Sequence, residues 1–323
     1  MAADSITRAV ATLRAGGLVA FPTETVYGLG ADASNVDAVK KVFAAKGRPS
    51  DHPLIVHIAD VEQLAQWACD IPQAARTLAK KFWPGPLTLI LKRAAHVKDA
   101  VTGGQDTVAL RVPAHPLAQT LLRTFGGGLV GPSANRFGHV SATTAAHVRD
   151  EFGNAIDFVI DGGTCEVGIE STIIDLSGDT PTLLRPGQIT AAAIEAALGA
   201  TLAAPNAQSP RAPGMLEKHY APRTPLMLVE ADMFDELVRS FVRQGQRVAV
   251  LAREANQPLI ENLAWIAAPV MPEGYAHDLY ANLRQLDAAG CNVIMVEEPP
   301  FAIAWVAVRD RLARAAAGAQ RHV

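Results

Sequence analysis

The chain has 323 residues, of which 49% are hydrophobic and 19% are charged. Single cores rarely grow beyond about 250 residues, so we expect about two domains, and the apolar content argues against disorder. The net charge of −3 argues against a surface that binds nucleic acid all over, although a local basic site remains compatible with it. Three scattered cysteines, Cys69, Cys165 and Cys291, form no CxxC pair, so neither a disulfide framework nor a zinc knuckle is indicated.

The N-terminus, MAADSITRAV, lacks the apolar core of a signal peptide. No stretch of about 18 uncharged apolar residues occurs, so no membrane span is predicted. Together with the cysteine usage, these observations predict a cytoplasmic protein that makes no use of a membrane.

The first 200 residues mix helices and strands without a strict βαβ alternation. The spacing of apolar residues predicts helices over 5–15 (capped by Asp4 or Ser5), 35–46, 61–69, 72–82, 116–125, 143–152 (capped by Ser141 or Thr143) and 190–198. Strands are expected over 18–21, 54–58, 87–92, 107–112, 129–130, 158–160, 171–176 and 182–184. This order predicts an α/β domain over residues 1–200 with a mixed, partly antiparallel sheet.

Residues 201–225 contain five prolines and no apolar period, which indicates a linker. The pattern restarts after it. Strands are predicted over 226–229, 248–251 and 292–296, and helices over 233–244, 275–289 and 304–316. This layout predicts a small, doubly wound, Rossmann-like domain over residues 226–323.

Several common motifs are absent or out of context. The run Gly126–Gly131 matches GxGxxG, but a helix precedes it and Pro132 follows it, which is the reverse of a dinucleotide-binding turn. The chain has no P-loop motif, no HExxH, no GxSxG and no EF-hand loop. Any nucleotide site must therefore be built in another way.

Six polar segments remain. Three are Gly168–Thr172, LLRPG (Leu183–Gly187) and KHYAP (Lys218–Pro222), and the other three each have two interpretations. In FPTETVYGLG (Phe21–Gly30), threonines and a glutamate follow a buried strand, as helix caps or ligand groups do; no helical period follows until Asn35, which favours a ligand site. In KGRPSDHPLIVHI (Lys46–Ile58), the cations suit the end of a helix as well as a phosphate. In GPSANRFGHVS (Gly131–Ser141), serines in a glycine-bounded loop form either a turn or a phosphate cradle.

Taken in order, the runs PTETVYGLG, KGRP, HPLIVHI, FWPGPLT, RVP, PSAN, GIESTIID and LLRPG resemble the YrdC-domain family. The linker run APGMLEKHYAP and the second predicted domain resemble the long, two-domain form of that family. The resemblance is dense over residues 5–198. It implies a YrdC-like twisted mixed sheet with helices, followed by a small Rossmann-like C-terminal α/β domain.

The resemblance also implies an activity. The long family members are nucleotidyltransferases that condense L-threonine, bicarbonate and ATP into threonylcarbamoyl-AMP and release pyrophosphate. A partner complex then transfers the threonylcarbamoyl group to tRNA, giving N6-threonylcarbamoyladenosine. We therefore expect these three substrates, a downstream transfer complex and a weak contact with tRNA. We expect Mg²⁺ to arrive with ATP, because the sequence shows no dedicated carboxylate cage.

Family positions assign roles to individual residues. Those that match the threonine site are Thr25, His57, Arg111 and Ser171, with Arg111 as a bidentate partner of the carboxylate. Those that face ATP are Lys46, Arg48, His52, Thr107, Ser133, Ser141, Arg185 and Tyr220. We expect Lys46, Arg48 and Arg185 to be catalytic, since they can neutralise phosphates as pyrophosphate leaves. In the linker, Tyr220 is expected to cover the adenine or ribose.

One position departs from the family pattern. Many members carry asparagine where this chain has His52, and a histidine there would make a nucleotide contact sensitive to pH.

Two other functions would use parts of the same sequence. An RNA-binding module without catalysis would use a basic rim formed by Lys46, Arg48, Lys80, Lys81, Arg111 and Arg136, but the slightly acidic net charge argues against it. A carbamoyl-transfer domain of the hydrogenase-maturation type would bring paired CxxC motifs for zinc fingers, which this chain lacks.

Overall fold

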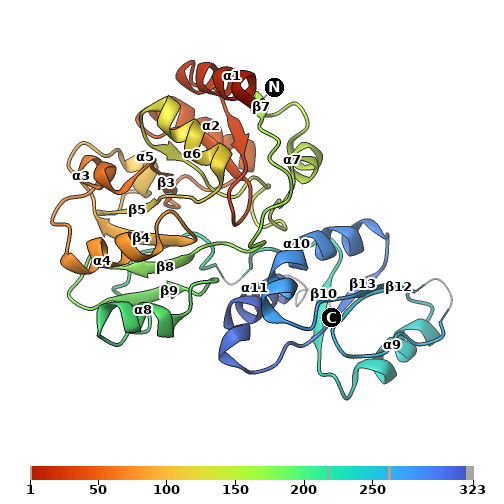
Figure 1. Cartoon of the computed structure of the whole chain (residues 1–323). Helices are drawn as coiled ribbons and strands as arrows, with labels where there is room; N and C mark the ends of the chain where they lie inside the picture. Colours follow the sequence, from red (N-terminus) through yellow and green to blue (C-terminus); the bar gives the residue numbers. More distant parts are fainter. Residues whose placement is uncertain (1, 217, 261–262, 318–323) are drawn as a thin grey trace. The chain divides into compact units, whose positions relative to one another are not determined.

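The computed structural model describes residues 2–216, 218–260 and 263–317. The chain divides into two compact units (Figure 1). The first comprises Met1–Phe137 and Ala142–Met215, and the second comprises Gly138–Ser141 and Leu216–Val323. The predicted linker, residues 201–225, is therefore shared between the two units, and a short piece of the predicted first domain belongs to the second.

The first unit is built on one mixed sheet. Its strands are β1 (Val19–Phe21), β2 (Gly28–Asp32), β3 (Ile55–His57), β4 (Leu87–Lys92), β5 (Thr107–Arg111), β6 (Leu129–Val130), β7 (Phe158–Val159), β8 (Thr172–Asp175) and β9 (Thr182–Arg185). They form a 9-stranded sheet in the order β7-β1-β2-β6-β3-β5-β4-β8-β9. Parallel and antiparallel pairs alternate irregularly, which confirms the predicted mixed α/β class.

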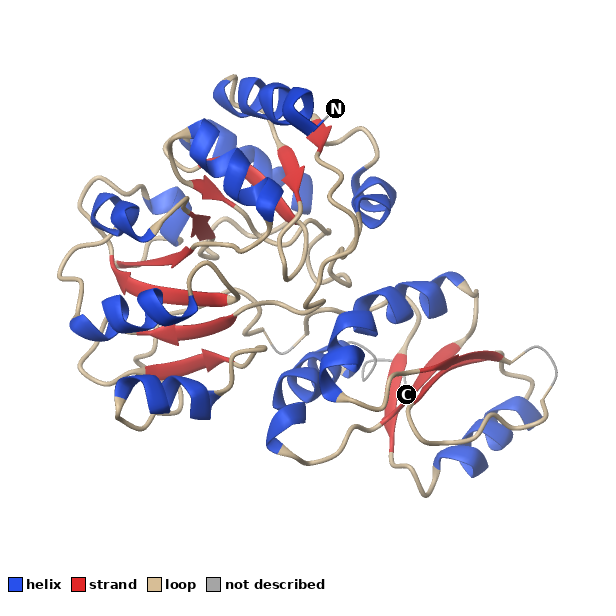
Figure 2. Cartoon of the chain, viewed as in Figure 1, coloured by secondary structure: helices blue, strands red, loops and turns tan. Residues whose placement is uncertain are grey.

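The helices of this unit are α1 (Ala2–Arg14), α2 (Val36–Lys46), η1 (Val61–Gln63), α3 (Leu64–Trp67), α4 (Gln73–Phe82), α5 (Asp99–Thr102), α6 (Pro116–Phe125), α7 (Ala145–Phe152) and α8 (Ala191–Leu198). Most of them pack on one face of the sheet, where alternate strand residues such as Val56, Leu89, Leu110 and Ile174 form the main core. On the other face α1 and α6 lie side by side (Figure 2) and cover the β1–β6 region.

On the rest of that second face, no helix of the described residues contributes to the apolar cluster. Its apolar side chains come from the intervening strand positions Ile55, Ile90, Ala109, Ile173 and Leu184. Side chains alternate between the two faces along a strand. The same face therefore receives His57 beyond Ile55, Arg111 beyond Ala109 and Thr88 before Ile90. The alternation of side chains along each strand therefore places the core residues on one face and brings these polar residues together on the other.

The first half of the predicted linker belongs to this face. Ala212 is buried against the five apolar side chains, and Met215 packs beside it. Arg211 holds the segment at its edge, since its backbone N–H donates to Gln105 Oε1 at 2.7 Å and its Nη2 donates to the Gly103 carbonyl at 2.9 Å. Residues 211–215 therefore cover the part of the sheet that the helices leave open.

The second unit is a 4-stranded parallel sheet in the order β10-β13-β11-β12. Its strands are β10 (Leu226–Val229), β11 (Val248–Ala252), β12 (Ala264–Ala267) and β13 (Val293–Glu297). Helix α9 (Phe234–Arg243) packs on one face, and α10 (Pro272–Ala288), η2 (Ile303–Trp305) and α11 (Val306–Ala316) complete the unit. The predicted Rossmann-like layout is confirmed, with β12 as an additional strand.

Glu297 occupies the carboxyl edge of this parallel sheet. It ends β13, is buried, and its Oε2 accepts hydrogen bonds from the backbone N–H groups of Arg253, Glu254 and Ala255 at 2.8, 2.9 and 3.0 Å. Converging backbone N–H groups form an anion-binding concavity. Here the loop after β11 binds an anion that the chain itself provides.

Several predicted element boundaries were wrong. The first helix begins at Ala2, so neither Asp4 nor Ser5 caps it. Thr144, rather than Ser141 or Thr143, caps α7 through a hydrogen bond from the N–H of His147 to its hydroxyl. The helix predicted over 61–69 is a 3-10 turn followed by one turn of α-helix. Over the described residues, no helix is long and apolar enough to cross a membrane.

Strand β2 was not predicted at all. Its glycines lower strand propensity, yet the packing requires them. A Cβ on Gly30 would come within 2.9 Å of the Val19 carbonyl and 3.0 Å of the Phe21 ring on the paired strand β1. The GLG run is therefore a strand whose missing side chains allow β1 and β2 to lie tightly together.

Candidate functional site

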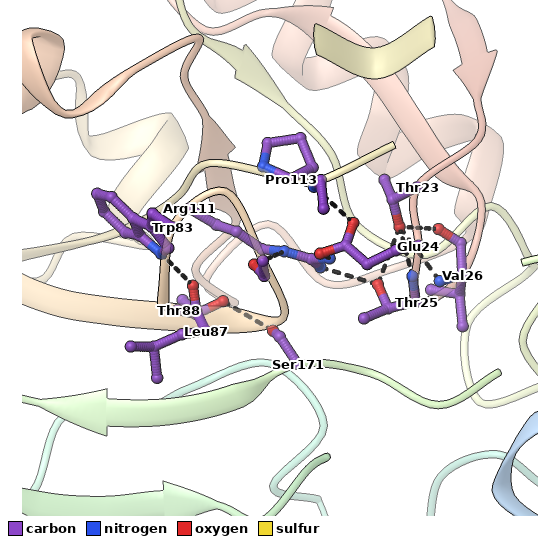
Figure 3. Close-up of polar contacts among 12 residues, drawn as sticks. Thr23, Glu24, Thr25, Val26, Trp83, Leu87, Thr88, Arg111, Pro113 and Ser171 are labelled. Carbon is purple, nitrogen blue, oxygen red and sulfur yellow. Dashed lines mark hydrogen bonds and ion pairs between the residues drawn. The ribbon is translucent and has the colours of Figure 1, made fainter. Parts of the chain in front are cut away.

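Arg111 is the centre of the polar cluster on the open face (Figure 3). It ends β5 and is 4% exposed. Its Nη1 donates to Thr25 Oγ1 at 2.8 Å and its Nε donates to the Gly85 carbonyl at 3.3 Å. These contacts fix the plane of the guanidinium, because a planar fork held at two of its nitrogens cannot rotate freely.

Glu24 faces the same guanidinium. Its Oε1 lies 2.7 Å from Arg111 Nη2, and its Oε2 accepts from the Ala114 N–H at 3.0 Å. The pair is in ionic contact, but neither Oε1 nor Nη2 forms a well-aligned hydrogen bond within the structure. An ion pair without hydrogen-bond alignment leaves an acceptor on Glu24 and donors on Arg111.

The loop that carries Thr25 is held by its own side chains. Thr23 Oγ1 donates to the Val26 carbonyl at 2.6 Å and accepts from the N–H groups of Thr25 and Val26 at 3.2 Å. The two threonine hydroxyls lie 2.9 Å apart. The PTET run is therefore a hydroxyl-braced turn that presents Thr25 to Arg111, and the alternative interpretation of a helix cap was wrong.

His57 lies beside Arg111, because β3 and β5 are parallel neighbours and the two residues are register partners. Burial, assisted by the charge of Arg111, lowers the pKa of the imidazole to about 3. The ring packs edge-on against Phe21 with centroids 5.6 Å apart, and a Cβ on Gly131 would lie 2.7 Å from its Nδ1. His57 is thus a neutral, tightly enclosed imidazole.

Ser171 and Arg185 form a second cluster from β9 and the residue preceding β8. Arg185 Nη2 donates to Ser171 Oγ at 3.1 Å, and its Nε donates to the Ser171 carbonyl at 3.0 Å. The Ser171 hydroxyl also lies 2.8 Å from that of Thr88 on β4. From the same guanidinium, Nη1 donates to the Pro213 carbonyl at 2.9 Å, so Arg185 ties the predicted linker to the site.

Lys46 lies at the last turn of α2 and is 3% exposed. Its Nζ donates to the carbonyls of Ser133, at 2.5 Å, and of Asn135. Burial, with a smaller contribution from the charge of Arg48, holds the pKa of this amine well below its usual value. Arg48 donates from Nη2 to the Pro53 carbonyl at 2.9 Å. KGRP and PSAN, far apart in sequence, therefore meet at one place.

Comparisons with known proteins show which family the chain belongs to. A family model for Sua5, YciO and YrdC proteins, described as "Telomere recombination", matches residues 11–187. The chain belongs to the Sua5/YciO/YrdC family. A second model, described as "Threonylcarbamoyl-AMP synthase, C-terminal domain", matches residues 189–317, so this is the two-domain form of the family.

Relatives in this family resemble the chain over nearly its whole length. A threonylcarbamoyl-AMP synthase from Pyrococcus abyssi is 42% identical over 94% of the chain and 91% of the relative. One from Bacillus subtilis is 43% identical over 97% and 93%. The crystal structure of P. abyssi Sua5 complexed with L-threonine superposes with a TM-score of 0.90 at 40% identity, covering 96% of this chain and 94% of that one.

The structure places ten of the twelve family-derived site residues in the first unit. Thr25, His57 and Arg111 come together, Ser171 joins Arg185, and Lys46 meets Ser133. Thr107 begins β5 and Arg111 ends it, four positions later. Because side chains alternate along a strand, the two residues lie on the same face. The burial of His52 and the neighbouring charge of Arg48 lower the pKa of that imidazole, whose ring packs edge-on against Phe137 at 5.5 Å.

Ser141 and Tyr220 belong to the second unit. Ser141 is buried, and its carbonyl accepts from Arg284 Nε at 3.2 Å. Tyr220 is buried, with its ring stacked on Tyr280 at 5.7 Å and the Arg311 guanidinium 5.4 Å from its centroid. Their predicted contacts with the nucleotide stay predictions.

The basic rim predicted for an RNA-binding surface was wrong for half of its members. Lys46, Arg48 and Arg111 are buried, and their donors point to backbone carbonyls, to Thr25 or to Glu24. Only Lys80, Lys81 and Arg136 are exposed. The three buried cations therefore do not form part of an exposed basic rim.

Glu24 and Thr88 were not assigned from the sequence. A glutamate in a threonine-rich turn is usually solvated, and a threonine in an apolar strand is usually structural. The signal for Thr88 was the strand alternation that also places Arg111 on the open face. No local signal identifies Glu24, whose partner is 87 positions further along the chain.

The described residues contain no group of three or more His, Cys, Asp or Glu side chains that could hold a metal ion. The carboxylate in the middle of the site, Glu24, is already in ionic contact with Arg111.

Proposed function

We propose that the chain is a threonylcarbamoyl-AMP synthase that acts on L-threonine, bicarbonate and ATP. The names of the relatives and the threonine complex of P. abyssi Sua5 support this proposal. The observation that carries it is the buried Arg111, fixed by Thr25 and flanked by neutral His57 on an open sheet face. A cation for the carboxylate and neutral hydrogen-bonding groups for the side chain are what a site for a small polar amino acid requires.

In this proposal threonine binds at Arg111. Its carboxylate takes the remaining N–H groups of the guanidinium, and its hydroxyl pairs with Thr25, His57 or Ser171. A site that pairs a substrate hydroxyl rejects an analogue without it by up to about 10⁴-fold, because the buried partner would stay unsatisfied. The neutral state of His57 allows one ring nitrogen to accept and the other to donate.

ATP lies beside threonine, with Lys46, Arg48 and Arg185 facing its phosphates. The amine of Lys46 now donates to two carbonyls, and a phosphate would replace one of these acceptors with a charged one. Hydroxyls of Thr107, Ser133 and Ser141 and the ring of Tyr220 complete the nucleotide contacts. His52 contributes a neutral imidazole, consistent with its lowered pKa.

The chemical step follows from these positions. The α-ammonium group of threonine gives up a proton to solvent, and the resulting amine forms a bond to the carbon of bicarbonate, which loses water. One oxygen of the carbamate so formed attacks the α-phosphorus of ATP. The bond from the α-phosphorus to the bridging oxygen breaks, and pyrophosphate leaves with its charge neutralised by Lys46, Arg48 and Arg185. The nucleotide substrate is the Mg²⁺ complex of ATP, since Mg²⁺ binds mainly through phosphates and retained waters.

The product is a reactive mixed anhydride, so a downstream threonylcarbamoyl-transfer complex must consume it. We propose that this complex acts on tRNA in the cytoplasm, and that any contact of this chain with tRNA is weak.

The test is threonine-dependent pyrophosphate release. The protein is incubated with Mg²⁺, ATP and bicarbonate, together with threonine, serine or no amino acid. We expect release to require an amino acid and to favour threonine. Pyrophosphate output that is indifferent to threonine would refute the proposal.

A further inference from the structure

Glu24 and Arg111 form a buried pair whose facing atoms both keep unused hydrogen-bonding capacity. The side chains of Glu24 and Arg111 are 5% and 4% exposed, and Oε1 and Nη2 are 2.7 Å apart without hydrogen-bond alignment. The other carboxylate oxygen is held by the Ala114 N–H, and the other guanidinium nitrogens are held by Gly85 and Thr25. The outer atoms of the pair are therefore held by the protein, while Oε1 keeps a lone pair and Nη2 keeps N–H groups for a further partner.

An α-amino acid presents the complementary pattern. Its ammonium and carboxylate are carried by one carbon atom, so they lie side by side and have opposite signs. A buried charge is costly unless it is paired and hydrogen-bonded. With Arg111 alone, a bound threonine would have its carboxylate paired and its ammonium buried without an anion. Glu24 removes that cost and keeps the occupied site electrically neutral.

We propose that Glu24 recognises the α-ammonium group of the amino-acid substrate while Arg111 takes its carboxylate. This inference rests on the proposed function and deepens it. Glu24 then determines specificity by demanding an amine, whereas Thr25, His57 and Ser171 read the side chain. A hydroxy acid that carries the carboxylate and the side-chain hydroxyl but no amine would offer Glu24 Oε1 no hydrogen-bond donor in addition to its ionic contact with Arg111.

The experiment measures binding by calorimetry of two ligands that differ only in the amine, L-threonine and (R)-3-hydroxybutanoate. Wild-type protein should prefer threonine. In Glu24→Gln, affinity for threonine should fall by about 10- to 100-fold, the usual effect of losing a hydrogen bond to a charged group. Affinity for (R)-3-hydroxybutanoate should change by less than about threefold, since its contacts with Arg111 remain.

Two matched glutamates serve as controls. Glu62→Gln, at an exposed position, should change neither affinity. Glu170→Gln, at another buried position of the same unit, should leave the preference for threonine intact. Equal losses for both ligands in Glu24→Gln would show that Glu24 only positions Arg111 and would overturn the proposal. A lost preference in Glu170→Gln instead would also overturn it.

If Glu24→Gln fails to fold, Glu24→Asp replaces it. Aspartate keeps the charge on a shorter side chain, so part of the preference for threonine should survive, and full loss or full retention would count against the proposal. A different result would contradict the proposed function itself: the wild-type protein would then bind neither threonine nor (R)-3-hydroxybutanoate measurably.

Discussion

His57 on β3 and Arg111 on β5 are direct register partners in a parallel pair, with both side chains on the open face of the sheet. Burial is the main reason why the imidazole stays neutral, because it disfavours the charged form. The neighbouring cation of Arg111 opposes protonation further. The two residues therefore form a site with one permanent positive charge and one neutral group that both donates and accepts.

The neutral state of His57 predicts a loss of stability in acid. The unfolded chain takes up a proton near pH 6.5, whereas folded His57 resists protonation down to about pH 3. Stability is therefore lost as the pH falls between these values, by about 3 kcal/mol at pH 4. Urea denaturation of wild type and His57→Asn at pH 7 and pH 4 measures this loss, with His96→Asn as an exposed control. An equal acid loss in His57→Asn would contradict the prediction.

The fork of Arg111 predicts that a lysine cannot replace it. Arg111→Lys keeps the charge but loses the contacts to Gly85 and Thr25 and the plane that they define. We expect the KM for threonine to rise by about 10- to 100-fold, with the KM for ATP changed by less than about threefold. Initial rates of pyrophosphate release at varied threonine and ATP decide this. A selective loss of ATP affinity would exclude the role assigned to Arg111.

The lowered pKa of Lys46 predicts proton uptake on ATP binding. In the free protein the amine is buried beside Arg48, which favours its neutral form. Phosphates would restore the proton, so ATP affinity should fall as the pH rises above the pKa of the free enzyme. Calorimetry in buffers of different ionisation enthalpy counts the protons taken up. Lys46→Met should abolish the uptake and weaken ATP by at least about tenfold; uptake that persists in this variant would implicate another group.

Glu297 predicts a local stability effect in the second unit. Glu297→Ala leaves three backbone N–H groups without their acceptor, which should cost about 3 kcal/mol. Hydrogen exchange should accelerate at Arg253, Glu254 and Ala255, and added formate should partly slow it again by filling the vacated anion site. The neighbouring Glu298→Ala should leave these amides unchanged. Exchange that is as slow in Glu297→Ala as in wild type would refute the prediction.

The sequence predicted site residues best where the strand pattern that identifies a strand also determines the face on which its polar side chain lies. The apolar runs LIVHI and TVALR predict strands, and the period of two along a strand places His57 and Arg111 on the face opposite Val56 and Leu110, which belong to the helix-packed core. What it does not predict is that β3 pairs with β5 rather than with β4. That pairing is a property of the whole sheet, and it decides that the two side chains are neighbours.

Family resemblance identified the residues that bear charge or hydroxyls, but it did not identify what holds them. The contact of Glu24 with Arg111 and that of Thr88 with Ser171 depend on tertiary structure. The missed strand β2 has a different cause. Its glycines allow the backbones of β1 and β2 to approach closely. Judged by local propensity alone, the same glycines indicate a turn.

The contacts of Arg185 determine where the chain can be shortened without disturbing the first unit. Its guanidinium holds the Ser171 hydroxyl with one nitrogen and the Pro213 carbonyl with another. A protein shortened at residue 200, where composition suggests a boundary, would lose Pro213 and would also expose the apolar surface that Ala212 covers. The first compact unit of this chain therefore extends to Met215, because residues 211–215 of the proline-rich stretch cover part of its sheet and do not merely connect two domains.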